Sequence, residues 1–396
     1  MRVFAISLAI VIVFAIVAGV LTLSGTDAAG RGLALSLALG AVFGVVLQRA
    51  RFCFFCNARD LVEHRDASGV LAILVALAVG VVGYMVVIGA WLPVPVAGRL
   101  PPDAHIGPVS WVLALAAMAF GLGMAISGSC ISAHLYRLGE GSPTSPFALI
   151  GALAGFALGF LTWNRLYLAE ISEAPVVWLP HHLGYAGTLG LSLAVLAILA
   201  LLTLLWARPH PQEQGAASET GHPISALGNR VFKARWPAVT AGLLVGGISA
   251  ASYLRVGPLG VTAELGSLAR SAANGWDLLP QTLYGLDGFR GCATVVKQAL
   301  LSENGLFVLG LVAASFASAL VAGQFTPRWP TARDVFSGLF GGLLMGWGGM
   351  TALGCTVGVL LSGIHAGALS GWVFLASAFL GLLIGLPVRR QLMAKA

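Results

Sequence analysis

The sequence predicts an all-α integral membrane protein. We expect about ten transmembrane segments, an inverted-topology internal repeat, and broken or re-entrant helices that meet near the midplane. Hydrophobic residues make up 58% of the 396 residues and charged residues only 9%, whereas a soluble domain carries about 25% charged residues. The hydrophobic residues form runs of membrane-spanning length. Two of these runs end in related glycine-rich sequences that each stop at a cysteine.

Ten apolar runs are long enough to form a spanning helix. They cover residues 3–23, 33–50, 70–92, 111–128, 146–163, 187–206, 237–255, 304–324, 335–354 and 371–388. Some are short and interrupted by glycine, which is frequent in membrane helices that pack closely or break. The first run is too long for the hydrophobic part of a signal peptide, so we expect it to remain as a helix.

Basic residues gather in alternate connections between these runs. They concentrate in segments 49–68, 207–236 and 326–334 and in the C-terminal tail. Because basic loops stay in the cytoplasm, the pattern places both termini there. The same rule explains the net charge of +7, so we expect the lipid bilayer, and not nucleic acid, as the surroundings. Segment 257–303 is the exception, and its length suggests that part of it folds back into the protein.

An internal repeat relates the two glycine-rich runs. Their glycine pairs are Gly121 with Gly123 and Gly346 with Gly348, and the closing residues, Cys130 and Cys355, lie 225 positions apart. The second copy begins five helices after the first, so the copies have opposite orientations, as in many transporters. Close packing through small residues is the alternative explanation, but packing alone does not require a thiol in both copies.

A weaker match extends the repeat, because Gly40 and Gly44 have counterparts in Gly242 and Gly246. These matches divide the chain into four parts. The parts are an extra N-terminal helix (1–32), a first repeat half (33–206), a cytoplasmic linker (207–236) and a second repeat half (237–396).

A helix that breaks at its cysteine would create an anion site. After the break, which Gly128 precedes in the first copy, the backbone N–H groups of the next half-helix point into the protein, and the helix dipole adds to their effect. A neutral buried thiol is a weak donor that does not repel an anion. The site therefore suits an anion with a soft, polarizable atom, above all sulfur.

Three motifs resemble the cysteine motifs of the YeeE/YedE family. They are "QRARFC" at 48–53, "FGLGMAISGSC…YRLGEG" at 120–141 and "LMGWGGMTALGC" at 344–355. The resemblance covers about residues 33–388 and implies a bacterial inner-membrane transporter for thiosulfate or related sulfur compounds. It further implies an hourglass-shaped helical protein in which Cys53, Cys130 and Cys355 pass thiosulfate along by S–H···S hydrogen bonds. We expect no cofactor and no enzymatic activity, and we consider a small cytoplasmic sulfur-carrier protein as a partner.

Four other residues are candidates for the same site. Cys56 forms a C-x-x-C pair with Cys53, and Cys292 lies near basic residues in "DGFRGCATVVK". Both cysteines depart from the family pattern. Arg51 and Arg137 lie close to cysteines in the sequence and could attract or release an anion; the alternative is that they anchor the cytoplasmic side.

Two other functions compete with sulfur-anion uptake. One is a carrier for selenium compounds or other anions, since selenium and sulfur differ little in size and softness. The other is a membrane thiol oxidoreductase, which needs paired cysteines on the side where disulfides are exchanged. Cys53 and Cys56 fall on the cytoplasmic side, while the repeat-related cysteines are single, which favours transport. A lone C-x-x-C without a second ligand pair does not predict a metal site.

Overall fold

The computed structural model describes residues 2–96, 98–208, 229, 231–276, 279–280, 282–286, 296 and 301–394. Within these residues the regular structure is helical, apart from single backbone bridges at Pro108–Val176 and Trp178–Ala368. Nine helices of this part of the chain are long and apolar enough to cross a membrane, or ten if one bent pair counts as a span. The prediction of an all-α membrane protein with about ten spans is confirmed.

Ten long helices correspond to the ten apolar runs. They are α1 (Arg2–Ser24), α2 (Ala28–Ala50), α4 (Ser68–Trp91), α5 (Trp111–Ser127), α7 (Ser145–Leu166), α8 (Leu179–Trp206), α10 (Ala238–Arg255), α12 (Glu303–Ala322), α13 (Ala332–Thr351) and α15 (Leu369–Ala394). Helix α2 begins earlier than its apolar run, because the Asp27 carboxylate accepts the Gly30 N–H at 2.7 Å and caps it. A polar cap of this kind extends a helix beyond its hydrophobic stretch.

Shorter helices follow four of the long ones. They are α3 (Phe54–His64), α6 (Ile131–Gly139), α11 (Thr262–Gly275), and the π-helical turn η3 (Thr356–Ser362) with α14 (Gly363–His365). A further π-helical turn, η1 (Tyr167–Ile171), continues α7. The axis bends by 43° between α13 and the η3–α14 segment. The broken helices expected from the sequence are therefore present.

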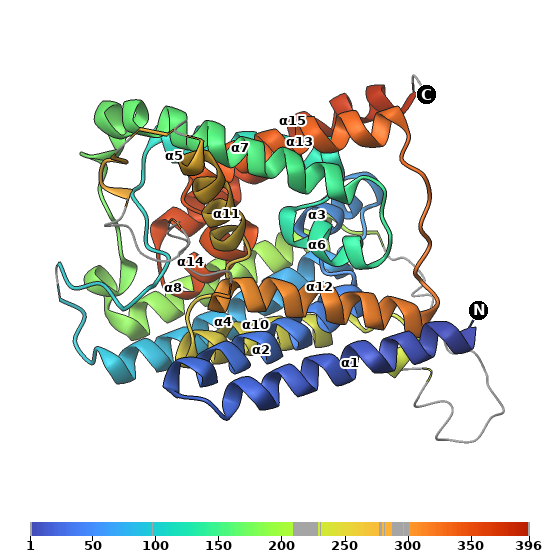
Figure 1. Cartoon of the computed structure of the whole chain (residues 1–396). Coiled ribbons are helices and arrows are strands. Elements are labelled where there is room, and N and C mark those ends of the chain that lie inside the picture. Colours follow the sequence, from blue (N-terminus) through green and yellow to red (C-terminus); the bar gives the residue numbers. More distant parts are fainter. Residues whose placement is uncertain are drawn as a thin grey trace.

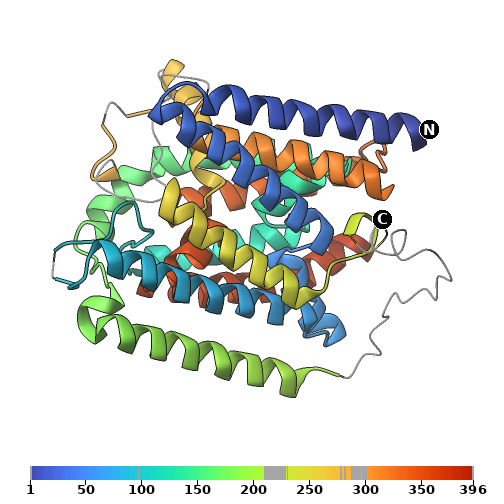
Figure 2. The same ribbon diagram turned by 90° about the horizontal axis from the view of Figure 1, so that it is seen from below.

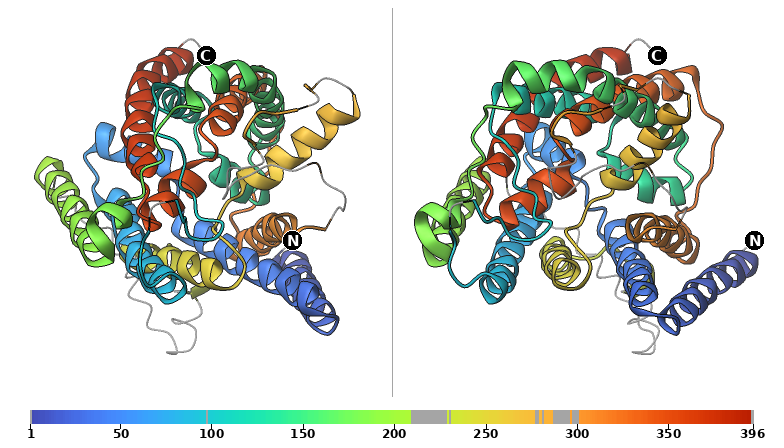
Figure 3. Two further views of the ribbon diagram at one scale, coloured as in Figure 1. Left: turned by 90° about the vertical axis from the view of Figure 1, so that its left-hand side faces the viewer. Right: turned by 60° about the vertical axis from the view of Figure 1, so that its left-hand side comes forward.

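The long helices form two layers with the short helices between them (Figure 1). One layer holds α5, α7, α13 and α15, and the other holds α2, α4, α10 and α12. Viewed from the end that carries the 98–110 connection, the two layers remain distinct (Figure 3). Helices α1 and α8 lie at opposite outer edges (Figure 2). Helix α1 contacts α2 and α12, and α8 contacts mainly α4. Both chain termini lie at the same end of the bundle (Figure 1).

Helix contacts are reciprocal between the two parts of the chain. Helix α2 packs on α12 as α10 packs on α4, and α5 packs on α15 as α13 packs on α7. The glycines show the same exchange. Gly40 and Gly44 face the backbone of α12, while Gly242 and Gly246 face the backbone of α4. This reciprocity is what an internal repeat with a pseudo-two-fold relation produces.

The repeat glycines bring backbones into direct contact. A Cβ on Gly121 would lie 2.0 Å from the carbonyl oxygen of Ala378, and one on Gly346 would lie 2.1 Å from that of Ala152. Gly123 faces Gly341, and Gly348 faces Ala116, so α5 and α13 cross closely. Small residues in membrane helices allow two helix backbones to approach this closely. These four glycines therefore shape the frame that holds the cysteines.

Replacing Gly346 with alanine should destabilise the protein by about 1–3 kcal/mol, because the new methyl group overpacks the α13–α7 contact. Gly247 provides a matched control, since nothing lies within 4 Å of a Cβ built there. Thermal unfolding of the purified protein in detergent measures both variants. Gly346→Ala should lower the midpoint and Gly247→Ala should not; equal midpoints for the two variants would contradict the packing argument.

Candidate functional site: buried thiols at three helix breaks

Three cysteines each occupy the N-cap position of a short helix that follows a break. Cys53 is the N-cap residue of α3, Cys130 that of α6, and Cys355 that of η3. All three side chains are completely buried. The expectation that Cys130 and Cys355 stand at helix breaks is confirmed, and Cys53 shares this arrangement.

Left-handed backbone precedes each of these cysteines. The C-cap residue of α2 is Arg51, with φ 51°, and that of α5 is Gly128, with φ 87°. After α13, Leu353 has φ 62° and Gly354 has φ 154°. Such residues end a helix sharply and let the chain start a new one in another direction. Of these residues, only Gly128 and Gly354 indicate a left-handed conformation by their residue type, since glycine adopts positive φ without steric cost.

Cys53, Cys56 and Cys130 form a compact group, which we call the thiol cluster. The Sγ atoms of Cys53 and Cys130 lie 4.0 Å apart, and the Cys56 N–H donates to Cys53 Sγ at 3.4 Å. Ser132 places its hydroxyl 3.3 Å from Cys130 Sγ. Residues from the two broken segments α2–α3 and α5–α6 thus meet inside the protein, although 77 positions separate Cys53 from Cys130.

Arg137 joins the thiol cluster to its surroundings. Its Nη2 donates to Cys56 Sγ at 3.1 Å, and its Nη1 lies 3.5 Å from the carbonyl oxygen of Gly128. Arg51, by contrast, is exposed where α2 ends. Among the contacts of the described residues, none connects the Arg51 side chain with a thiol.

Cys355 occupies a separate position at the α13–η3 break. Its Sγ accepts the Val357 N–H at 3.4 Å, and Thr262 at the start of α11 lies close to it. Among the hydrogen bonds of the described residues, none joins Cys355 to the thiol cluster. Cys292 lies outside the described residues.

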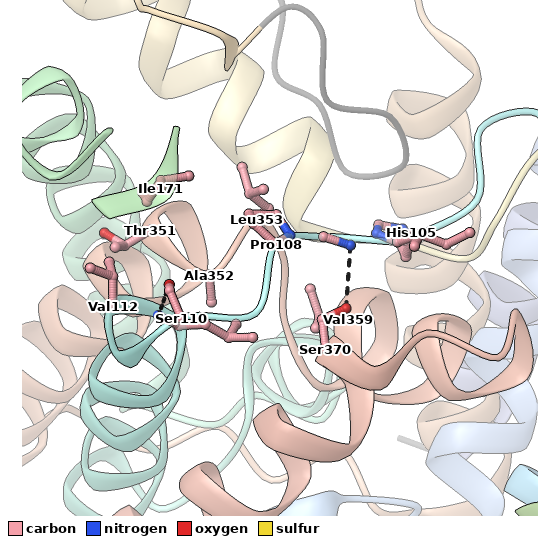
Figure 4. A pocket seen from close by; sticks show the side chains of 13 residues that line it. His105, Pro108, Ser110, Val112, Ile171, Thr351, Ala352, Leu353, Val359 and Ser370 are labelled. Atoms are coloured by element: carbon pink, nitrogen blue, oxygen red, sulfur yellow. Dashed lines mark hydrogen bonds between the residues drawn. The ribbon is translucent and has the colours of Figure 1, made fainter. Parts of the chain in front are cut away.

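A small cavity, which we call the outer cavity, adjoins the α13–η3 break (Figure 4). It has a volume of about 20 Å³ and includes residues from Thr351 to Leu353 of the break. The 105–110 segment passes over it, where the Gly107 N–H donates to Ser370 Oγ at 3.3 Å. A cavity needs about 10–15 Å³ to hold one water molecule, so the outer cavity is too small for a polyatomic anion in this conformation. Burial lowers the pKa of His105 in its wall to about 4, so this imidazole is neutral at pH 7.

A larger cavity of about 520 Å³ lies at the other end of α5. Val112 and Leu113 line the outer cavity, while Ile126 and Ser127 line the larger one. At 1.5 Å per residue, the helix separates the two cavities by about 20 Å. Arg137 lines the larger cavity and also contacts Cys56. The thiol cluster therefore lies next to this cavity, with the Arg137 side chain between them.

A family model for sulphur transport matches residues 49–384, a range that contains all three helix breaks. The chain belongs to this sulphur-transport family.

Relatives in the family carry transporter names. The thiosulfate transporter TsuA of Spirochaeta thermophila is 29% identical over 360 residues, which cover 87% of this chain and 94% of the relative. The thiosulfate transporter TsuA of Escherichia coli is 27% identical and covers 87% of this chain and 91% of the relative. A probable transporter, YedE of Salmonella typhimurium, is 26% identical over 44% of this chain and 41% of its own length.

The sequence did not predict that Thr262 and Arg389 lie near the cysteines. Thr262 reaches Cys355 from another helix, and the Arg389 guanidinium lies against Gly128. Both residues are far from any cysteine in the sequence, and no local pattern marks them. Arg389 had the properties of a cytoplasmic anchor at the end of an apolar run. Only the packing of α15 against α5 brings it to the site.

Mild oxidation should form a disulfide between Cys53 and Cys130. Their sulfur atoms lie 4.0 Å apart, and a small rotation of the two side chains brings them to bonding distance. Diamide treatment of a Cys56→Ala variant removes the competing neighbour, and peptide mass spectrometry identifies the linked pair. Cys355 should remain a free thiol in the same sample. A disulfide between Cys53 and Cys355 in place of the Cys53–Cys130 link would contradict the arrangement described here.

Proposed function

We propose that the protein takes up thiosulfate, or a related small sulfur-containing anion, across the bacterial inner membrane. The observation that carries this proposal is the thiol cluster, in which Cys53 and Cys130 from two helix breaks lie 4.0 Å apart in the protein interior. Similarity over 87% of this chain to two proteins named thiosulfate transporters supports the same substrate class. In this proposal both termini lie in the cytoplasm, as the basic connections indicate.

Backbone and thiol donors together explain how an anion is held at depth. The half-helices α3, α6 and η3 begin at the three cysteines, so the positive ends of their dipoles lie at the thiols. Each S–H group donates to the outer sulfur of the anion, and no covalent bond forms or breaks. Where two thiols are neighbours, the anion passes from one to the other when its S–H···S hydrogen bond to the first thiol is replaced by one to the second.

The proposed path runs from the outer cavity to the large cavity. The anion passes the outer cavity and Cys355, reaches Cys130 and Cys53, and leaves toward Arg137. Ser132 adds a hydroxyl donor at Cys130. Helix α6, which begins at Cys130, contains one imidazole, that of His134. This imidazole is hydrogen-bonded to Ser145 at 3.2 Å and not to a thiol. This supports a relay that uses neutral thiols over one that uses an imidazole as base.

A membrane thiol oxidoreductase is the second candidate, since Cys53 and Cys56 form a C-x-x-C pair. Their side chains are 0% and 9% exposed. Disulfide exchange with a partner protein requires an accessible attacking sulfur. The burial of both thiols therefore favours transport over exchange.

Uptake of thiosulfate should fall at least about tenfold in Cys53→Ala, Cys130→Ala and Cys355→Ala, since each change removes a hydrogen-bond donor from a buried site. Cys130→Ser keeps a donor but loses the soft sulfur contact, so its uptake should also be weak. Growth on thiosulfate as sole sulfur source, in a strain without other importers, measures each variant, with protein levels checked in the membrane. If Cys130→Ser transports at the wild-type rate, the thiol relay is wrong and the site is a simple polar pore.

The proposed relay leaves the cysteines chemically unchanged, so uptake should continue without added reductant. Intact-protein and peptide mass spectrometry after turnover should show unmodified Cys130 and Cys355. The control is protein incubated with sulfate, which lacks the outer sulfur atom. A stoichiometric persulfide on either cysteine during turnover would replace the hydrogen-bond mechanism by a covalent one, while uptake itself would remain assigned.

A further inference from the structure

The large cavity is lined by four arginines. We call it the arginine vestibule and define it by Arg137, Arg328, Arg333 and Arg389, which line it together with several hydroxyl side chains. Arg137 comes from α6 and Arg389 from α15, while the other two flank the start of α13. Basic residues that are far apart in the sequence thus converge on one cavity of about 520 Å³.

One carboxylate, that of Asp334, also lines the vestibule, and it is bonded to groups of the protein itself. It forms an ion pair with Arg328 at 3.2 Å. Its oxygens also accept the Thr331 hydroxyl at 2.7 Å and the Thr144 hydroxyl at 2.8 Å. Asp334 therefore balances one guanidinium. Among the described residues, no carboxylate pairs with Arg137, Arg333 or Arg389, so the vestibule carries a local excess of positive charge.

Two of these unbalanced arginines separate the vestibule from the thiols. Arg389 Nη1 donates to the carbonyl oxygen of Ala125 at 3.1 Å, and its guanidinium lies 5.5 Å from the ring centre of Phe55. Arg137 contacts Cys56 and lies near the carbonyl oxygen of Gly128. The last carbonyls of α5 therefore hold both cations, as helix C-termini favour positive charge. Both side chains are half-buried, which limits screening by water.

We propose that the arginine vestibule is a second anion site, specific for small doubly charged oxyanions. Guanidinium groups recognise oxyanions through charge-assisted and bidentate hydrogen bonds, and a volume of a few hundred Å³ suits a small ligand. The helices α7 and α13 also begin here, with Thr144 and Thr331 as their N-cap residues, which adds two positive helix ends.

The vestibule deepens the proposed function and, in its role within transport, rests on it. The thiols recognise a soft sulfur atom, whereas the vestibule recognises charge and oxygen. An anion that leaves the thiols toward Arg137 therefore enters a region of positive potential, which draws it to this end of the protein. The two sites consequently differ in selectivity. Sulfate, which has the charge and the oxygens but no outer sulfur, binds the vestibule and not the thiols.

Sulfate binding to the full-length protein tests this directly. The protein is reconstituted in phosphatidylcholine nanodiscs, and its unfolding temperature is titrated with sodium sulfate against sodium chloride of equal ionic strength. A ligand that binds the folded state raises this temperature. Wild type should show saturable, sulfate-specific stabilisation. Arg389→Gln and Arg333→Gln should each weaken the apparent sulfate affinity at least about tenfold, because each removes a charge-assisted contact.

Arg390→Gln is the matched control. Arg390 neighbours Arg389 in the sequence but forms an ion pair with Glu63 at 2.9 Å and does not line the vestibule. It should keep the wild-type sulfate response, and Arg389→Lys should restore most of the response that Arg389→Gln loses. The double variant Cys53→Ser, Cys130→Ser should respond to sulfate as wild type does, which separates this site from the thiols even if thiosulfate uptake is absent.

Three results would overturn the proposal. The first is an unchanged sulfate affinity in Arg389→Gln and Arg333→Gln. The second is loss of the sulfate response in the cysteine variant, which would place sulfate at the thiols. The third is a matching arginine-dependent stabilisation in nanodiscs that contain phosphatidylglycerol, together with loss of the sulfate response there. That result would assign the vestibule to a lipid phosphate group.

Discussion

The fold depends on breaking helices inside an apolar protein without leaving their backbone groups unsatisfied. Irregular backbone is tolerated at membrane depth only where other groups supply its hydrogen bonds or where it lines a cavity. Here cysteine sulfur meets part of this need. Cys53 accepts the Cys56 N–H and Cys355 accepts the Val357 N–H, so each sulfur caps the half-helix that follows its break. The residue that stabilises the break is thus also the residue that presents a thiol to the interior.

Close packing of the long helices supports the backbone around these breaks. Gly123 and Gly348 let α5 and α13 cross with their backbones in contact, and Gly121 and Gly346 let each helix approach the other half of the chain. On each helix the crossing point and the following cysteine lie about two helical turns apart. The glycines therefore position the thiols although they do not need to contact a ligand themselves.

Charge divides the interior into two chemically different regions. At Cys53 and Cys130 the hydrogen-bonding partners are sulfur, a hydroxyl and one N–H group of a half-helix, which suits an anion that is only weakly held. At the arginine vestibule, guanidinium groups exceed carboxylates by three, which suits firm electrostatic binding. Arg137 belongs to both regions. Weak binding at depth and stronger binding at one mouth allow an anion to cross the narrow part without being trapped there.

The sequence by itself determined the ten spans, the internal repeat and the breaks at Cys130 and Cys355, because each rests on local information such as run length, glycine spacing or a closing cysteine. It also named Cys53 and Arg137 as candidate site residues. Tertiary structure alone decided that Cys53 meets Cys130, that Cys355 stands apart, and that Arg389 and Thr262 reach the thiol regions. These contacts join segments that lie on different helices. They depend on how α5, α13 and α15 are rotated and packed, and hydrophobic periodicity does not carry that information in helices that are apolar on every side.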